Sequence, residues 1–254
     1  MKVVFHDSFL NTYTRDPAAA YGRLDPTLKA VKEHHTLITP KPCLDEDVLL
    51  VHTQNHLEDV KYEEYVYKTA LLAVGSTIKA SEIAMEGDYS FALCRPPGHH
   101  ASPDSCWGFC YFNNIAIAVL KLLTEEKINS ALIVDFDLHF GDGTSNTFAE
   151  NEKVNYYHVK GENRTSFVDN LQAYLDKTSA ADVVAVSAGF DRHYSDWGHM
   201  LYTEDYHTMG FMLGNYARKN SQGRLFAALE GGYNANSLGD GIMAFLRGLE
   251  DSKG

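Results

Sequence analysis

Short apolar runs alternate with longer amphipathic segments along most of the chain. The apolar runs predict six strands, at Val3–His6, Ser90–Arg95, Ala131–Asp137, Val154–Tyr157, Val183–Ser187 and Arg224–Leu229. The amphipathic segments predict five helices, at Glu64–Met85, Asn114–Lys127, Ser166–Asp176, Thr203–Arg218 and Asn236–Glu250. Because runs such as Ala-Leu-Ile-Val (131–134) are apolar at every position, we expect their strands to be covered on both faces. The alternation of strands and helices predicts an α/β fold with a mainly parallel sheet between two layers of helices.

The composition is that of an ordinary globular protein, with 44% hydrophobic and 22% charged residues among 254. Because the sequence lacks repeats, low-complexity tracts and Pro/Gly/Ser-rich linkers, we expect residues 1–254 to form a single domain. No stretch reaches the ~20 apolar residues of a membrane span. The charges of Lys2 and Asp7 come too early for a signal peptide, so we expect a cytoplasmic protein. Four cysteines without the paired spacing of a zinc site favour free thiols.

Acidic residues outnumber basic ones by 34 to 22, which gives a net charge of −12. This charge argues against binding to a nucleic-acid backbone, because such binding requires a cationic surface. An acidic surface attracts cationic substrates such as lysine-rich tails or polyamines, but it also serves solubility alone. The net charge does not distinguish these two interpretations.

Polar clusters follow four of the predicted strands. In open parallel sheets, sites form at the carboxyl ends of the strands, so we expect the four clusters to meet at one rim. The clusters are Arg95–His100, Asp135–His139, Ser187–Asp191 and Glu230–Tyr233.

Two of these clusters contain a candidate metal centre. Asp137 and His139 lie two positions apart at a strand end, where their side chains can share one side, and Asp191 follows another strand. Carboxylate and imidazole groups bind zinc, and three protein ligands leave one position open for water or a carbonyl oxygen. The alternative is that Asp-x-Asp-x-His forms only a hydrogen-bonded turn, although the position of Asp191 weighs against it.

His99 and His100 are adjacent on a loop stiffened by two prolines. Beside a metal, two imidazoles can serve as general base and general acid near neutral pH. Each imidazole needs an orienting partner, and Asp135 and Asp142 are candidates. Tyr233 follows two glycines, so its hydroxyl can enter the site and donate a hydrogen bond to a developing oxyanion. The alternative is a tyrosine of the core or of a lid.

Five motifs together resemble the zinc-dependent histone deacetylase family, which includes the acetylpolyamine amidohydrolases. They occur in family order and are Arg-Pro-Pro-Gly-His-His-Ala (95–101), Trp-Gly-Phe-Cys-Tyr-Phe-Asn-Asn (107–114), Asp-Phe-Asp-Leu-His-Phe-Gly-Asp-Gly-Thr (135–144), Ser-Ala-Gly-Phe-Asp (187–191) and Glu-Gly-Gly-Tyr (230–233). The resemblance implies the arginase–deacetylase fold, an open and mainly parallel α/β sheet of about eight strands. It further implies a histone deacetylase-like catalytic domain that uses one Zn²⁺ ion to hydrolyse the amide of acetyl-lysine or of a related acylated primary amine.

The same resemblance assigns catalytic roles to individual residues. His100 matches the proton shuttle and His99 its electrostatic partner. The residues that match their carboxylate partners are Asp142 for His100 and Asp135 for His99. The residues that match the zinc ligands are Asp137, His139 and Asp191.

Other matches concern the substrate. Tyr233 matches the residue that polarises the scissile carbonyl. Gly108 and Phe109 match the wall of the acyl-lysine tunnel, and we expect Trp197 to contribute to it. Arg23 resembles an arginine near the channel through which acetate leaves.

Three segments depart from the family pattern. Between Tyr157 and Asp182 the chain is short, and Lys160–Arg164 replace the family's Phe/Tyr-Pro wall. One side of the tunnel is therefore open or is supplied by another subunit, which leaves oligomerisation open. His158 falls where the family has a serine of a potassium site, so K⁺ remains an open expectation. Ser195–Gly198 replace an Asp-Pro-Leu-Gly-like rim and include no glutamate of the kind that favours polyamines.

Two other functions remain as alternatives. An arginase-like binuclear hydrolase needs additional carboxylates, but Gly141 and His193 occupy the corresponding positions. A non-catalytic acyl-lysine-binding or scaffold protein would have lost a metal ligand, a catalytic histidine or the tyrosine, and none of these is lost. An active hydrolase is therefore the preferred interpretation.

Overall fold

Seven parallel strands form one sheet in the computed structural model, which describes residues 1–254. Along the sheet they follow the order β2-β1-β3-β7-β6-β4-β5. The strands are β1 (Lys2–Val4), β2 (Thr36–Ile38), β3 (Ser90–Ala92), β4 (Ala131–Asp135), β5 (Val154–His158), β6 (Val183–Ala188) and β7 (Leu225–Leu229). The predicted α/β fold with a mainly parallel sheet is confirmed, and all six strand pairings are parallel. The sheet has seven strands, where the resemblance suggested about eight.

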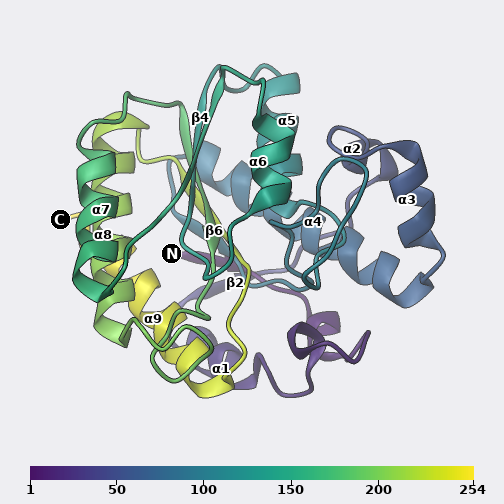
Figure 1. Ribbon diagram of the computed structural model, residues 1–254, viewed down its shortest axis with the longest axis horizontal. Helices are drawn as coiled ribbons and strands as arrows, with labels where there is room; N and C mark the ends of the chain where they lie inside the picture. Colours follow the sequence, from purple (N-terminus) through teal and green to yellow (C-terminus); the bar gives the residue numbers. More distant parts are fainter.

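Helices cover both faces of the sheet. They are α1 (Asp25–His34), α2 (Asp45–Val48), α3 (Gln54–Lys61), α4 (Glu64–Met85), α5 (Asn114–Thr124), α6 (Asp142–Phe148), α7 (Arg164–Leu175), α8 (Thr203–Asn220) and α9 (Ala235–Asp251), with short 3₁₀ helices at Asp7–Leu10 and Pro17–Ala19. Figure 1 shows α7, α8 and α9 on one side of the central strands and α4 and α5 on the other. None of the helices combines the length and apolarity needed to cross a membrane.

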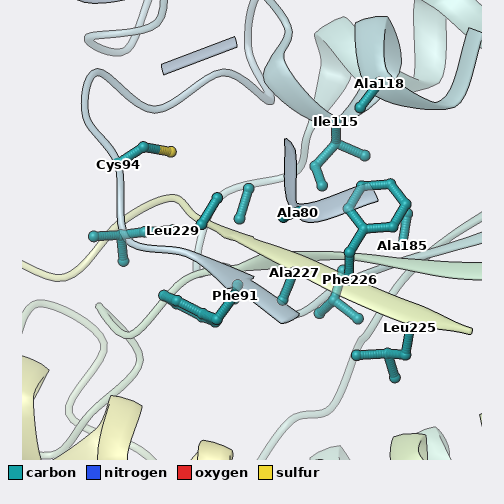
Figure 2. Close-up of a cluster of buried hydrophobic side chains, with 14 of the residues drawn as sticks. Ala80, Phe91, Cys94, Ile115, Ala118, Ala185, Leu225, Phe226, Ala227 and Leu229 are labelled. Carbon is teal, nitrogen blue, oxygen red and sulfur yellow. The ribbon is translucent and has the colours of Figure 1, made fainter. Parts of the chain in front are cut away.

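The middle of the sheet is closed to solvent because both of its faces carry apolar side chains. Figure 2 shows the ring of Phe226 on β7 directed toward Ile115 of α5, and both side chains are fully buried. On β3, the ring of Phe91 pairs edge-on with Phe245 of α9, with ring centres 6.4 Å apart. Neighbouring strands thus contribute to both helical layers, as the continuous apolar runs predicted.

All six predicted strands and all five predicted helices are present, and their ends differ from the predicted ones by three residues at most. The predictions missed one strand, β2, and four helices, α1, α2, α3 and α6, each of which contains at most three buried residues. The edge strand β2 contains no fully buried residue, and the four residues of α2 include one, Val48. Elements as short as β2 and α2 leave no periodic signal, whereas α1 and α3 each bury one face and were overlooked.

The four strands that precede the polar clusters, β3, β7, β6 and β4, are neighbours in the sheet. Since all four are parallel, their carboxyl ends lie at the same rim, as predicted. β4 ends at Asp135, two residues before the predicted end. There the Asp135 Oδ1 atom accepts a hydrogen bond from the N–H of Asp137 (3.0 Å), which turns the chain. Asp137 and His139 therefore lie on a turn beyond the strand.

Phe226→Ala tests how strongly this core stabilises the fold. Phe226 is fully buried between β7 and α5, so truncation leaves a cavity, and we expect the free energy of unfolding to fall by about 3–5 kcal/mol. Urea unfolding of purified variants measures this loss. The matched control is Phe211→Ala on α8, where the side chain is 41% exposed and a much smaller loss is expected. Equal losses in the two variants would contradict this description of the core.

Candidate active site

Asp137, His139 and Asp191 meet at the rim, with ligand atoms within 4.8 Å of one another. The Nδ1 atom of His139 lies 3.3 Å from Asp137 Oδ1 and 3.2 Å from Asp191 Oδ2. Asp191 Oδ2 is buried and has no hydrogen-bond partner. One imidazole and two carboxylates, with one oxygen left free, fit a zinc ion that keeps an open coordination position.

The turn that carries these groups is fixed by its own side chains. The N–H of His139 donates to Asp137 Oδ1 (2.9 Å), and the N–H of Leu138 donates to Asp191 Oδ1 (3.0 Å). Burial and the negative charge of Asp137 raise the pKa of Asp191 to about 6. The hydrogen-bonded turn is therefore present, and the same residues remain available as metal ligands.

The two adjacent histidines each have a carboxylate partner. His99 Nδ1 lies 3.1 Å from Asp135 Oδ2, and His100 Nδ1 lies 2.6 Å from Asp142 Oδ1. Burial acts to lower the pKa of His99, but the charges of Asp137 and Asp135 outweigh it and hold this pKa well above its ordinary value. Burial and the neighbouring His99 lower the pKa of His100 to about 4. The two opposite pKa shifts favour the charged form of His99 and the neutral form of His100.

Trp107 is a part of the site to which no role was assigned from the sequence, although it begins the 107–114 motif. Its indole N–H donates to Asp142 Oδ2 (2.8 Å), and its ring lies against the ring of His100, with centres 3.9 Å apart. Asp142 therefore has one oxygen on His100 and the other on Trp107. The only signal in the sequence is that Trp107 directly precedes the Gly-Phe pair of the tunnel wall.

A cavity of about 360 Å³ lies beside His139, one of the three candidate metal ligands. The ring of Tyr233 stacks on Trp197, with centres 3.9 Å apart, and Phe109 packs edge-on against both rings. Asp196 Oδ2 accepts hydrogen bonds of 2.7 Å from the N–H groups of Tyr233 and Asn234, which holds the turn after the two glycines. The cavity is lined by Pro97, His99, His100, Trp107, Gly108, Phe109, His139, Trp197, Gly231 and Tyr233.

Gly108 and Phe109, which the resemblance predicts to form a tunnel wall, have an unusual backbone conformation. Gly108 has a φ of 59° and Phe109 a φ of 66°, so both lie in the left-handed region. At Gly108 a Cβ atom would collide with the ring of His100, so the glycine allows the loop to approach the histidine. A residue with a Cβ atom is strained in this region, so the conformation of Phe109 raises the free energy of the folded state. Such strain is common for residues at functional sites.

Arg23 lies behind Tyr233 and is not among the residues that line the cavity. Its Nε–H donates to the carbonyl oxygen of Gly232 (2.7 Å), and an Nη2–H donates to that of Glu230 (2.9 Å). The guanidinium carbon lies 5.4 Å from the centre of the Tyr233 ring. Arg23 thus supports the tyrosine turn, and its contact with an exit channel stays a prediction.

A second group of potential ligands shares His99 with the histidine pair and adds Cys110 and Glu230. Glu230 Oε2 accepts hydrogen bonds from the N–H groups of Gly98 (2.7 Å) and His99 (3.1 Å). Burial raises the pKa of Glu230 to about 7. All three side chains are buried, and the bonds of Glu230 fix the loop that carries the histidines.

The positions that a binuclear centre would need are poorly suited to ligands. A Cβ atom at Gly141 would lie 2.6 Å from the Tyr156 hydroxyl and closer still to Asp135, so a carboxylate does not fit there. His193 Nε2 lies 3.3 Å from the Thr203 hydroxyl, and His193 Nδ1 accepts a hydrogen bond from the N–H of Ser195. These contacts disfavour a second metal ion.

The shortened segment between residues 158 and 182 contributes no residue to the cavity lining. Arg164, at the start of α7, pairs instead with Glu204 (2.6 Å) and Asp205 (2.7 Å) of α8. These ion pairs join the segment to α8. The wall of the cavity is formed by residues from other parts of the chain.

Comparison with known proteins identifies relatives of this chain. The sequence model of the histone deacetylase domain matches residues 18–170 and 160–249, and the two matches overlap in the shortened segment. A probable deacetylase of Methanothermobacter thermautotrophicus is 28% identical over 286 residues, which cover 90% of this chain and 84% of that protein. Histone deacetylase 5 of Arabidopsis thaliana is 30% identical over 89% of this chain, and the match covers 44% of the plant protein.

A solved structure shares the architecture. The crystal structure of the HDA15 HD domain superposes with a TM-score of 0.86 and 25% sequence identity, over 99% of this chain and 89% of that one. The predicted arginase–deacetylase fold is confirmed by this similarity and by the parallel sheet.

Zinc titration tests the metal centre. At a free zinc concentration about 100 times the Kd, binding adds about 2.7 kcal/mol to the free energy of unfolding. We therefore expect zinc to raise the Tm by several degrees, at about 2–4 °C for each kcal/mol in a chain of this size. Asp191→Ala removes one ligand and is expected to abolish both the Tm shift and the bound zinc.

Asp169→Ala is the control, because Asp169 is an exposed carboxylate on α7, away from the metal ligands. This variant is expected to bind zinc as the wild type does. An unchanged zinc content and Tm shift in Asp191→Ala would rule out the ligand assignment.

Proposed function

The chain belongs to the histone deacetylase family, and from that premise we propose that it is a zinc-dependent deacylase that hydrolyses the amide of acetyl-lysine or of a related acylated primary amine. The observation that carries the proposal is the convergence of three metal-ligand side chains and two carboxylate-paired histidines on one cavity. We further propose that residues 1–254 act as one histone deacetylase-like catalytic domain in the cytoplasm.

Asp137, His139 and Asp191 would hold the metal. A zinc ion bound there would supply a Lewis acid that polarises the substrate carbonyl and lowers the pKa of a water molecule. Two observations support this assignment. Asp191 Oδ2 has no hydrogen-bond partner, and His139 Nδ1 lies within 3.3 Å of one oxygen of each carboxylate.

The histidine pair would move the protons. The Nδ1 atom of His100 is hydrogen-bonded to Asp142 Oδ1. The other ring nitrogen, Nε2, is therefore left to accept the proton of the attacking water. The low pKa of His100 supports this role, because a base must be neutral before it accepts a proton. His100 would then protonate the leaving amine as the C–N bond breaks, and the products are a carboxylic acid and a free amine. His99, whose raised pKa favours the charged form, would stabilise the negative charge that develops beside it.

Tyr233 would donate a hydrogen bond to the oxyanion of the tetrahedral intermediate. Burial, together with the charges of Asp137 and Asp191, raises the pKa of its phenol, so the hydroxyl keeps its proton and remains a donor. Arg23 and Asp196 hold the turn that carries it, which supports a fixed position for the hydroxyl.

The substrate would enter between aromatic rings. Gly108, Phe109 and Trp197 line the cavity and would contact the extended stem of an acylated lysine or of a small acylated amine. The net charge of −12 favours a cationic peptide or polyamine over a nucleic acid. A second subunit remains a candidate for the missing wall beside the 158–182 segment.

Two alternatives receive less support. A non-catalytic acyl-lysine-binding protein would not need a histidine beside the metal ligands whose Nδ1 atom is paired with a carboxylate, as that of His100 is with Asp142 Oδ1 (2.6 Å). An arginase-like binuclear hydrolase would need ligands at Gly141 and His193, where the first position lacks space and the second side chain is engaged elsewhere.

His100→Ala tests the proposed chemistry. General acid–base assistance contributes about 10²–10⁴-fold, so we expect kcat/KM for an acetyl-lysine peptide to fall by that factor while the zinc content stays unchanged. The assay uses zinc-loaded protein, with metal analysis of the same samples.

The matched control is His207→Ala, which removes an exposed histidine of α8 that pairs only with Asp251 (2.8 Å). This variant is expected to keep wild-type activity. If His100→Ala hydrolyses the peptide within a few-fold of the wild-type rate under saturating zinc, His100 is not the proton shuttle.

Acyl-chain length tests the consequence of the shortened segment. Each buried methylene is worth about 0.8 kcal/mol, or roughly fourfold in kcat/KM, so a closed tunnel discriminates steeply between chain lengths. Because residues 158–182 contribute no wall here, we expect acetyl-, butyryl- and longer acyl-lysines to differ less than such a tunnel predicts.

Trp197→Ala serves as the positive control, since it removes a ring that does line the cavity and is expected to flatten the profile further. A steep preference for acetyl alone, measured on a monomeric sample, would disprove the open wall.

A further inference from the structure

Arg192 directly follows the metal-ligand candidate Asp191 and is 8% exposed. Its Nε–H donates to the carbonyl oxygen of Asp137 (3.1 Å), and an Nη2–H donates to the carbonyl oxygen of Leu138 (3.1 Å). The guanidinium therefore binds the backbone of the turn that carries two of the three metal ligands. Neither the motifs nor the proposed reaction assigns it a role.

The surroundings of Arg192 explain why a buried cation is stable there. Asp135, Asp137 and Asp191 are each at most 1% exposed. Their negative charges oppose the lowering of the guanidinium pKa by burial, although none of them forms a direct ion pair with Arg192. A guanidinium cannot lose its proton in a protein, so Arg192 supplies a permanent positive charge to this group of carboxylates. A buried charge needs hydrogen bonds and charges of opposite sign to compensate its desolvation, and Arg192 has two hydrogen bonds to carbonyl oxygens as well as the negative charges of the nearby turn.

The shortened segment contributes to this arrangement. The guanidinium carbon lies 4.6 Å from the centre of the Phe167 ring, and Phe167 is a fully buried residue of α7. At Gly161 a Cβ atom would collide with the Phe167 backbone, so the glycine allows α7 to pack closely there. Burial removes water from this side of the guanidinium. The face of the Phe167 ring replaces that water as a cation–π partner.

The residues in this region do not fit a potassium ion. Potassium binds rings of oxygen atoms, often backbone carbonyls. The carbonyl oxygens of Asp137 and Leu138 already accept hydrogen bonds from Arg192, whose charge would repel a second cation. Near Asp135, an imidazole replaces the serine hydroxyl of the family pattern, with His158 Nδ1 3.7 Å from Asp135 Oδ1.

We propose that Arg192 is a positioning residue that takes the place of a bound monovalent cation: it holds the 137–138 carbonyls and balances the buried carboxylates, so that the zinc ligands keep their geometry without potassium. This inference rests on the proposed function, because it assumes that Asp137, His139 and Asp191 bind zinc. It predicts that metal affinity depends on Arg192 and not on the salt.

The first test compares the wild-type protein in KCl and NaCl at matched ionic strength. Zinc affinity, measured by competition with a chelator, and the Tm are expected to be the same in both salts. A higher zinc affinity or a higher Tm in KCl than in NaCl would overturn the proposal, because it would reveal a potassium site. This test needs no variant and therefore does not depend on whether a variant folds.

The second test uses variants of Arg192. Residues that orient metal ligands typically contribute about 10–100-fold to metal affinity, and we expect Arg192→Met to weaken zinc binding by a factor in that range. Arg192→Lys keeps the charge and is expected to retain more of the affinity than Arg192→Met. In Arg192→Ala, added methylguanidinium is expected to restore part of the lost affinity.

The matched control is Arg164→Met, which removes a partly exposed arginine that also lies over an aromatic ring, 4.7 Å from the centre of Tyr202. It is expected to leave zinc affinity unchanged. Wild-type affinity in Arg192→Met, or equal losses in Arg192→Met and Arg192→Lys, would overturn the role of Arg192 alone. Failure of the wild-type protein to bind zinc would instead contradict the proposed function.

Discussion

Four carboxylates buried at one rim of the sheet impose the constraint on which the rest of the site depends. Asp135, Asp137, Asp191 and Glu230 are each at most 1% exposed. Burying like charges together costs several kcal/mol for each ion unless partners compensate. The compensation comes from backbone N–H groups of the turns and from imidazoles, while one guanidinium binds the backbone carbonyls of the same turn. Asp191 Oδ2 and Glu230 Oε1 have no hydrogen-bond partner, and Asp191 belongs to the group of candidate metal ligands, where a bound cation would complete the balance.

Much of this arrangement could be predicted from the sequence, because it follows from two simple rules. Continuous apolar runs identified the buried strands, and a parallel sheet brings the carboxyl ends of its strands to one rim. Residues directly after those strands, such as His99, Asp137 and Asp191, were therefore expected to meet, and they do. The exact end of β4 was missed because the side chain of Asp135 turns the backbone, and such a hydrogen bond has no periodic signature.

Contacts between distant segments could not be predicted in this way. Trp107 binds a carboxylate 35 positions away, and Arg192 binds a carbonyl oxygen 55 positions away. Nothing in the local pattern around either residue indicates its partner, since both depend on how loops of different strands pack above the sheet. The same limit applies to Arg23, whose sequence position suggested a channel and whose hydrogen bonds join it to the tyrosine turn. The hydrophobic pattern defines the framework, while long-range packing defines the support around each functional group.

The placement of the two tryptophans has a spectroscopic consequence. The chain contains only Trp107 and Trp197, and both line the cavity, one against the ring of His100 and the other against that of Tyr233. Each indole is about half exposed, so its emission is sensitive to the replacement of solvent by a bound molecule. Because no tryptophan lies elsewhere, the tryptophan fluorescence of the folded protein originates entirely at the site. The protein therefore carries its own optical reporter, through which occupancy of the cavity can be followed without a label.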